Sequence, residues 1–248
     1  MKSALRLAAW MIGVARQLAW IYLIGWVAQT TTKGFDFDEF LIVPLRVHLL
    51  SAEGESPLKT SLKEADIERI IPKINNVWAQ AGIHFYVESL VKEEAVPGEI
   101  PDHPGKGPFL WLLSHIPRAT QATNLFNLYF VKQFAVNGVY FHDAIFVKDT
   151  ASLRPVSGGL DEPIPRVTAH ELGHALSLLH RQNFTNLMAS GTTGTQLNGA
   201  EIKDARLAAK TFDWIQTAPA VLKIARELEH EGKSKEAGDL FKRLEGLF

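Results

Sequence analysis

Apolar and polar positions along this 248-residue chain repeat with different periods, and each period predicts a different element. Alternating apolar residues predict strands over residues 41–50 and 83–87. Between them, apolar residues at helical spacing predict a helix over residues 61–82, which opens on a capping-box pattern. Pro72 lies inside that helix and is expected to kink it. This part of the chain therefore predicts a strand, a long helix and a second strand.

The middle of the chain combines a segment rich in proline and glycine with short apolar runs. Residues 91–108 are expected to form a loop, and the apolar run over residues 109–116 predicts a short helix. Apolar runs over residues 125–134 and 139–148 predict two further strands. The dipeptide Asn137-Gly138 between them is typical of tight β-turns, so it is expected to join them.

Helical periodicity dominates the last third of the chain. One helix is expected to begin near Pro163, because proline suits the first turn of a helix. A second is expected to open on a cap from Asn198 to Glu201 and to end near residue 212. Two amphipathic patterns, over residues 220–230 and 234–247, predict a C-terminal helical hairpin.

Residues 1–33 differ from the remainder, with apolar runs over residues 7–15 and 18–28 on either side of Arg16. A single membrane-spanning helix would place Arg16 near the middle of the bilayer, at a cost of about 2.5–3.5 kcal/mol. A signal sequence fits the basic start and the short apolar run, and a buried or amphipathic helix is a third interpretation. Basic residues on the amino side predict that the rest of the chain is exported, either released or anchored to a membrane through residues 7–28.

Composition limits the classes of partner. Hydrophobic residues make up 46% of the chain, which is enough for a full core. With 26 basic and 27 acidic residues the net charge is −1, so no electrostatic argument favours a nucleic-acid partner. The chain has no cysteine, which excludes disulfides and thiolate metal ligands. Any bound transition metal must therefore use nitrogen and oxygen ligands.

Three histidines and a glutamate carry the strongest chemical signal. His170 and His174 are four residues apart on a predicted helix, so both imidazoles point to one side and can hold a zinc ion at about 2.0–2.1 Å each. Glu171 can reach a water on that metal as a general base. His180 becomes a third ligand only if the helix stops near Ser177 and the chain turns back. Three protein ligands plus water is the open coordination of a catalytic zinc.

Other interpretations of these residues stay open. Leucines on the opposite face of the same helix would also suit a core helix that carries histidines by chance. Glu201, with Asp204 nearby, could replace His180 as the third ligand, and Asp161 or Glu162 could orient a ligand histidine. The remaining histidines are interpreted as ordinary polar residues: His48, His84, His103, His115, His142 and His230. Of these interpretations we favour the zinc site.

The run His170-Glu171-x-x-His174-x-x-Ser177-x-x-His180 resembles the extended zinc motif of the metzincin metallopeptidases, and most of all that of the matrixin-like branch. That family usually has glycine where this chain has Ser177, because glycine readily takes the positive φ needed as the helix ends.

A second hallmark of the family is a methionine in a tight turn beneath the metal, and Asn186-Leu187-Met188 resembles it in spacing. The resemblance implies an α+β fold with a twisted mixed sheet, long helices, a zinc helix and a Met-turn. It also implies that an exposed edge strand, over residues 125–134 or 139–148, pairs with extended substrate.

These observations predict three parts: a signal sequence or membrane anchor over residues 1–33, a metzincin-like peptidase domain over residues 34–213, and the helical hairpin over residues 214–248. The expected function is that of a Zn²⁺-dependent endopeptidase acting on protein or peptide substrates outside the cytoplasm, with Glu171 as general base. The alternative is a non-catalytic extracytoplasmic binding module that retains the peptidase fold and uses the hairpin to bind a partner.

Overall fold

The computed structural model describes residues 34–103 and 109–247. The interpretation of residues 1–33 as a signal sequence or membrane anchor falls outside the described residues. Among the helices that are described, none combines the length and the apolar character needed to cross a bilayer.

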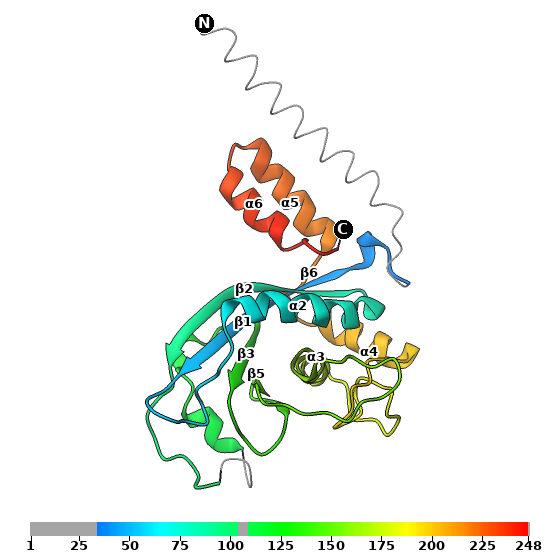
Figure 1. Cartoon of the computed structure of the whole chain (residues 1–248). Coiled ribbons are helices and arrows are strands. Elements are labelled where there is room, and N and C mark those ends of the chain that lie inside the picture. The colour runs from blue at the N-terminus through cyan, green and yellow to red at the C-terminus, as the bar shows by residue number, and fades with distance from the viewer. Residues whose placement is uncertain (1–33, 104–108, 248) are drawn as a thin grey trace, which may run out of the picture.

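A mixed sheet forms the centre of the described chain (Figure 1). Its strand order is β2-β1-β3-β5-β4, with the short β6 paired to β1. Strands β2, β1, β3 and β5 run parallel, whereas β4 and β6 run antiparallel to their neighbours β5 and β1. The strands are β1 Leu41–Ser51, β2 Ile83–Glu94, β3 Phe126–Val131, β4 Gly138–Phe141, β5 Ala144–Lys148 and β6 Gln216–Thr217.

One face of this sheet packs against two helices, α2 (Glu64–Trp78) and α3 (Pro163–Ala175). The helical stripe predicted from the sequence becomes the buried side of α2, which continues through the exposed Pro72. Trp78 is fully buried, and its indole N–H donates to the carbonyl of Ala169 at 3.2 Å. This bond fixes α2 against α3, so the sheet and α2 together support the helix that carries the histidine motif.

Two sequence predictions for the strands are wrong. Residues 91–94 belong to β2 rather than to a loop, because β1 continues to Ser51 and pairs with them to the end. Residues 139–148 are not one strand: β4 and β5 form a hairpin whose two turn residues, His142 and Asp143, have positive φ values of 48° and 62°. Two positive φ values are what a two-residue type I′ hairpin turn requires.

The turn predicted at Asn137-Gly138 is therefore also wrong. Strand β3 pairs in parallel with β5, so β3 and β4 are not neighbours and no tight turn joins them. Asn137 instead donates its side-chain amide to the carbonyl of Ser152 at 2.8 Å. The predicted helix over residues 109–116 is a short 3-10 helix, η3 (Leu110–Ser114), in a second core on the other face of the sheet.

Helices α4, α5 and α6 form most of the C-terminal part of the described chain. α4 (Gly199–Ala209) opens on the predicted capping box, in which Asn198 and Glu201 accept from each other's backbone amide. α5 (Ala218–His230) and α6 (Ser234–Lys242) lie side by side, on the opposite side of β1 and β2 from α3 and α4 (Figure 1). They share a small apolar cluster with the start of β1, which includes Phe40, Ile42, Val221 and Leu244.

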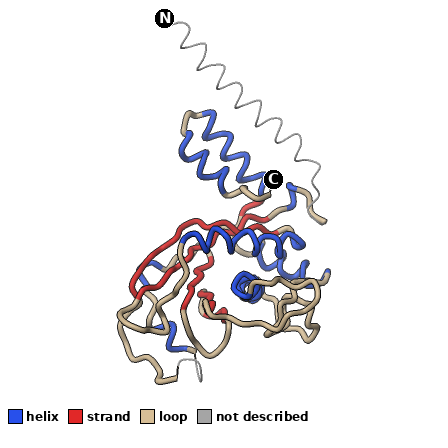
Figure 2. Tube along the Cα trace, in the orientation of Figure 1, coloured by secondary structure: helices blue, strands red, loops and turns tan. Residues whose placement is uncertain are grey.

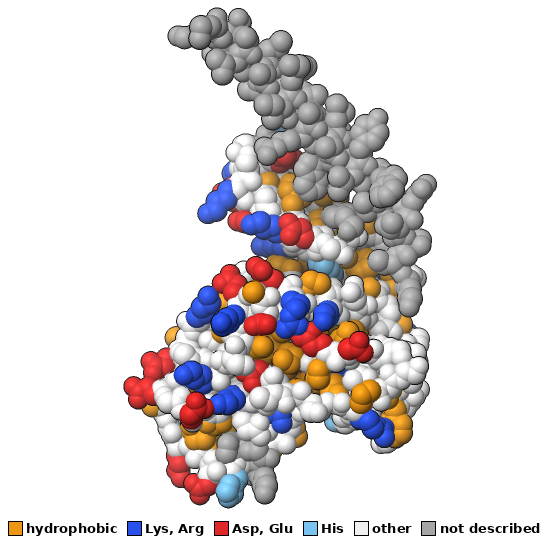
Figure 3. Space-filling model, in the orientation of Figure 1, with side chains coloured by type: hydrophobic (Ala, Val, Ile, Leu, Met, Phe, Trp, Pro, Cys, Tyr) orange, Lys and Arg blue, Asp and Glu red, His pale blue; other side chains and the backbone are white. Residues whose placement is uncertain are grey.

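Long loops and a mixed surface complete the described chain. Figure 2 shows that the segment between α3 and α4 is almost entirely loop, and this segment contains the residues of the expected Met-turn. Acidic and basic side chains alternate over the face drawn in Figure 3, in keeping with the nearly neutral net charge. The fold thus places the histidine motif between α2, the sheet and one long ordered loop.

Candidate metal centre

Helix α3 ends at the point that the third histidine requires. The amide of Ser177 donates to the carbonyl of His174 at 3.0 Å, and the amide of Leu178 donates to that of Gly173 at 2.9 Å. This pair of bonds is the Schellman arrangement, which needs a left-handed residue just after the helix. Ser177 takes that position with a φ of 67°. The chain therefore reverses directly after α3 and returns towards the histidines.

We predict that Ser177→Gly raises the free energy of unfolding of the metal-free protein by about 0.5–1 kcal/mol. Glycine removes the steric cost of the left-handed backbone, although it also gains entropy in the unfolded chain. Urea unfolding in the presence of a chelator measures the change, with Ser177→Ala as the control because alanine keeps the Cβ atom. Loss of stability in the glycine variant would contradict the strain assigned to this turn.

The turn brings three imidazoles together. His174 Nε2 lies 3.1 Å from His170 Nε2 and 3.1 Å from His180 Nε2, and the three potential ligand atoms all lie within 4.8 Å of one another. A tetrahedral metal with nitrogen ligands at 2.0–2.1 Å separates those nitrogens by about 3.3–3.4 Å. His170 is buried, His174 is half-buried and His180 is exposed, so the group opens to solvent on one side.

The hydrogen bonds of the first two histidines determine which ring nitrogen carries the proton. His170 Nδ1 lies 2.7 Å from the carbonyl oxygen of Leu187, and His174 Nδ1 lies 2.8 Å from that of Leu178. A carbonyl oxygen only accepts, so each Nδ1 is a donor. Burial lowers the pKa of His170 to about 3 and also lowers that of His174, so both rings are neutral at pH 7.

It follows that both Nε2 atoms present a lone pair, and two lone pairs at 3.1 Å repel rather than form a hydrogen bond. A cation between them converts this repulsion into coordination. The donor set of three imidazole nitrogens suits zinc, among other first-row transition metals. The residues present therefore fit a metal ion with three protein ligands.

Glu171 lies one residue from His170 on α3 and has only 5% of its surface exposed. Burial raises the pKa of its carboxyl group to about 8, while a backbone hydrogen bond from Tyr140 and the charge of Arg166 oppose that rise. Tyr140 belongs to β4, the edge strand next to β5. The carboxylate is thus held between the histidine helix and the edge strand.

Gly138 explains how β4 comes so close to this carboxylate. A Cβ atom built on Gly138 would lie 2.5 Å from Val167 Cγ1 and 2.7 Å from Glu171 Oε1, distances that real side chains do not reach. Only glycine allows the strand to approach α3 here. Glycine at position 138 is therefore required by a close approach and not by the turn that the sequence predicts.

Met188 lies fully buried in the loop that follows His180. Asn186 shapes a tight turn around it, accepting from the Met188 amide through its side chain at 2.7 Å and from the Ala189 amide through its carbonyl at 3.1 Å. A Cβ atom on Gly173 would lie 2.5 Å from Met188 Sδ. The thioether therefore packs against α3 at Gly173, between His170 and His174 in the sequence, where a larger residue at position 173 would displace it.

Two of the acidic residues considered from the sequence, Glu201 as a ligand and Glu162 as an orienting group, bind other side chains. Glu201 is fully buried and accepts from Arg181 Nε at 2.6 Å, from Asn186 Nδ2 at 2.8 Å and from the Asn198 amide at 2.8 Å. Glu162 pairs with Arg69 and Lys73 on α2 and does not contact a ligand histidine. The groups that orient His170 and His174 are instead two backbone carbonyls, which no residue type in the sequence could have indicated.

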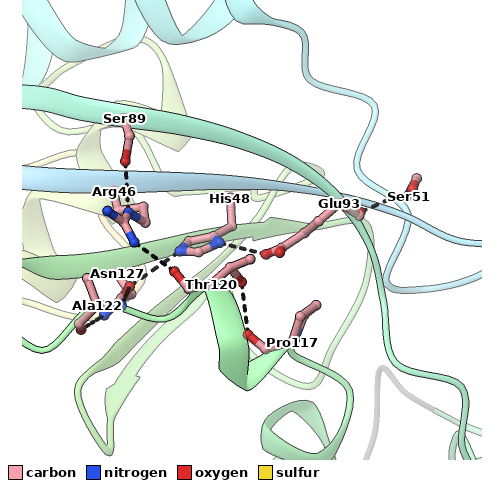
Figure 4. Close-up of polar contacts among 9 residues, drawn as sticks. All are labelled: Arg46, His48, Ser51, Ser89, Glu93, Pro117, Thr120, Ala122 and Asn127. Atoms are coloured by element: carbon pink, nitrogen blue, oxygen red, sulfur yellow. Dashed lines mark hydrogen bonds and ion pairs between the residues drawn. The ribbon is translucent and has the colours of Figure 1, made fainter.

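A second polar group lies on the other face of the sheet (Figure 4). His48 is fully buried, with Nδ1 2.6 Å from Glu93 Oε1 and Nε2 3.3 Å from Asn127 Oδ1. Because Asn127 Oδ1 already accepts from the Ala122 amide, His48 Nε2 must donate to it. His48 Nδ1 and Glu93 Oε1 are therefore joined by a hydrogen bond, while Nε2 is held by Asn127. His48 was expected to be an ordinary polar residue, and its burial follows only from the packing of three strands.

No family model matches the chain, and a search of curated proteins finds no match. Among solved structures, the chain is similar to the crystal structure of archaemetzincin from Methanopyrus kandleri, with a TM-score of 0.46 and 15% sequence identity. The similarity covers 68% of this chain and 96% of that chain. A likeness this distant does not decide function, which rests on the residues of the site.

Proposed function

We propose that this chain is a zinc-dependent endopeptidase. The observation that carries the proposal is the convergence of two unprotonated Nε2 atoms at 3.1 Å, with a third histidine beside them and the buried carboxylate of Glu171 on the same helix. This arrangement supports a metal site with a base next to it. His170, His174 and His180 would hold the ion, and three protein ligands leave a coordination position open.

A bound zinc ion supplies Lewis acidity, which acidifies water and polarises a carbonyl group. Glu171 accepts the proton of the attacking water and passes it to the leaving amine. Its burial favours the first transfer, since a carboxylate with a raised pKa accepts a proton more readily than one that titrates near 4. The Tyr140 amide and Gly138 hold the carboxylate in place during these steps.

Strand β4 supports a peptide as the substrate. Of the two strands considered from the sequence, β3 lies between β1 and β5, so it has no free edge. β4 ends the sheet order and lies against Glu171. An extended peptide that adds to β4 by backbone hydrogen bonds would therefore pass next to the base. We assign substrate alignment to residues 138–141.

The resemblance to the matrixin-like metzincins supports the same function. Ser177 takes the left-handed φ that the glycine of the family would provide, and Met188 packs under the helix where a Met-turn is expected. The basic and apolar residues 1–33, which lie outside the described part, support export of the enzyme.

Metal analysis and peptide cleavage by the purified full-length chain test the proposal. We expect about one zinc per chain and cleavage of an unstructured protein substrate, abolished by a chelator and restored by zinc. Circular dichroism before and after chelation separates loss of metal from loss of fold. A folded chain that binds zinc and cleaves no substrate in a broad peptide screen would favour the binding module. If the folded chain binds no zinc, the proposed zinc site is wrong.

A further inference from the structure

Arg166 is a buried charged residue that the proposed mechanism does not use. It lies on α3 four residues before His170, on the same side of the helix, and is only 1% exposed. Its guanidinium donates to four backbone carbonyls of the loop that follows His180. Nε bonds Gly194 at 3.0 Å, and Nη2 lies 3.3 Å from the carbonyl oxygen of Asn186, 2.7 Å from that of Leu187 and 2.6 Å from that of Ala189.

One of these carbonyls also orients a ligand histidine. The oxygen of Leu187 accepts from Arg166 Nη2 at 2.7 Å and from His170 Nδ1 at 2.7 Å. A carbonyl oxygen has two lone pairs, so these two donors use its full capacity. The position of the Leu187 carbonyl therefore depends on Arg166, and the orientation of the His170 ring depends on that carbonyl.

The charge of Arg166 has no carboxylate partner among the described residues within salt-bridge distance. A buried charge is costly unless it is fully hydrogen-bonded, and an apolar side chain would fill the same space without that cost. Burial lowers the pKa of Arg166 only to about 10, so the group remains charged at neutral pH. The four hydrogen bonds therefore compensate for the buried charge, and the guanidinium in turn holds the four carbonyl oxygens in place.

The second ligand histidine shows why the first one needs this support. His174 bonds the carbonyl of Leu178, a residue whose own amide is tied to Gly173 by the turn that ends α3. Leu187 lies instead in the loop between α3 and α4, and along the chain it is well separated from the end of α3 at Ala175 and from the start of α4 at Gly199. A carbonyl in a loop has to be held by other groups, and Arg166 reaches it from the helix that also carries His170.

We propose that Arg166 is a positioning residue, which fixes the Leu187 carbonyl so that His170 presents its Nε2 lone pair before the metal arrives. This inference rests on the proposed metal site but not on the reaction that the site performs. It predicts that metal affinity depends on Arg166 although its guanidinium donates to backbone carbonyls of the loop and not to a histidine.

The main test compares Arg166→Lys with Thr192→Val. The lysine ammonium keeps the charge but lies about one bond short of the Nη2 position, so it releases the Leu187 carbonyl. The control removes two other hydrogen bonds of the same loop and leaves the Leu187 carbonyl untouched: one from Thr192 Oγ1 to the Phe184 carbonyl at 2.8 Å and one from the Gly194 amide to Thr192 Oγ1 at 3.4 Å. We expect Arg166→Lys to weaken zinc binding by about 10–100-fold in a chelator competition, the range seen when the partner of a ligand histidine is lost. Thr192→Val should bind zinc as the wild type does.

The visible spectrum of bound Co²⁺ provides a readout that loop stability alone would not change. We expect the bands of the Arg166→Lys protein to shift, because one imidazole ligand is no longer fixed, and those of Thr192→Val to match the wild type. Unfolding of each metal-free protein confirms that the compared samples are folded. Wild-type zinc affinity and spectrum in Arg166→Lys, or an equal loss in Thr192→Val, would overturn the proposal.

The metal-free wild-type protein offers a test that needs no folded variant at position 166. Nitrogen-15 spectra of labelled histidine should show His170 as the tautomer protonated at Nδ1, with His170→Gln used for assignment. A mixture of tautomers would show that the ring is not fixed before metal binding and would refute the proposal. Peptide cleavage by the wild type is scored separately, so failure of the peptidase function is distinguishable from failure of this inference.

Discussion

Glu171→Gln is expected to lower kcat/KM for peptide cleavage by about 10²–10⁴-fold while about one zinc per chain stays bound. Glutamine keeps the shape of the side chain and an oxygen that can accept from the Tyr140 amide. It lacks the basicity needed to take a proton from water. Because Glu171 is 5% exposed, the neutral amide also avoids the cost of burying a carboxylate, so stability should not fall. Cleavage assays and metal analysis on the same samples measure both effects.

Glu162→Gln is the matched control for this experiment. Glu162 is the residue just before α3, and its carboxylate pairs with Arg69 and Lys73 rather than facing the histidines. Its loss should leave cleavage within a few-fold of the wild type. Glu171→Ala, which removes the carboxylate and leaves a gap, should also retain zinc and lose cleavage. Turnover close to wild type in either Glu171 variant would mean that another group moves the proton.

His180→Ala is expected to weaken zinc binding by at least about 100-fold, more than the loss of a group that only orients a ligand. The alanine variant leaves two imidazoles, His170 and His174, and opens a further coordination position to water. Since His180 is exposed and follows the turn at Ser177, its replacement should change the stability of the metal-free fold very little. Zinc titration against a chelator of known affinity measures the loss.

Two further variants show whether the loss is specific. His230→Ala removes a histidine from the end of α5 and should bind zinc normally. Glu201→Gln tests the alternative ligand, and it too should retain zinc, because Glu201 already accepts from Arg181, Asn186 and Asn198. Full zinc content in His180→Ala, together with loss of zinc from Glu201→Gln, would show that Glu201 and not His180 is the third ligand.

The sequence determined those features of the site that depend on short-range geometry. The four-residue spacing of His170 and His174 places their rings on one side of any helix, and Glu171 follows from the same helix. The capping box at Asn198 could be predicted for the same reason, since it uses contacts within one turn. The apolar stripe of α2 and the alternation in β1 likewise result from the periods of a helix and a strand.

Only the tertiary structure decided how separate segments meet at the histidines. Serine disfavours a left-handed backbone at position 177, yet the hydrogen bonds that end α3 impose one. The resulting turn places His180 next to His174. Gly138 was predicted as a turn residue because its partner strand was unknown; packing of β4 against α3 makes it a contact point for Glu171. Arg166 resembles any surface arginine in the sequence, and its role depends on a loop about twenty residues away.

The physical reason is the range of the interactions. Spacing and capping involve residues within about one helical turn, and their energies can be assigned from residue type alone. A buried guanidinium, a carbonyl shared by two donors and a glycine under a strand depend on which segments pack together, and backbone carbonyls carry no residue identity at all. The sequence therefore contains the chemistry of the histidine motif, whereas the orientation of that chemistry comes from the packing of α3, β4 and the loop between α3 and α4.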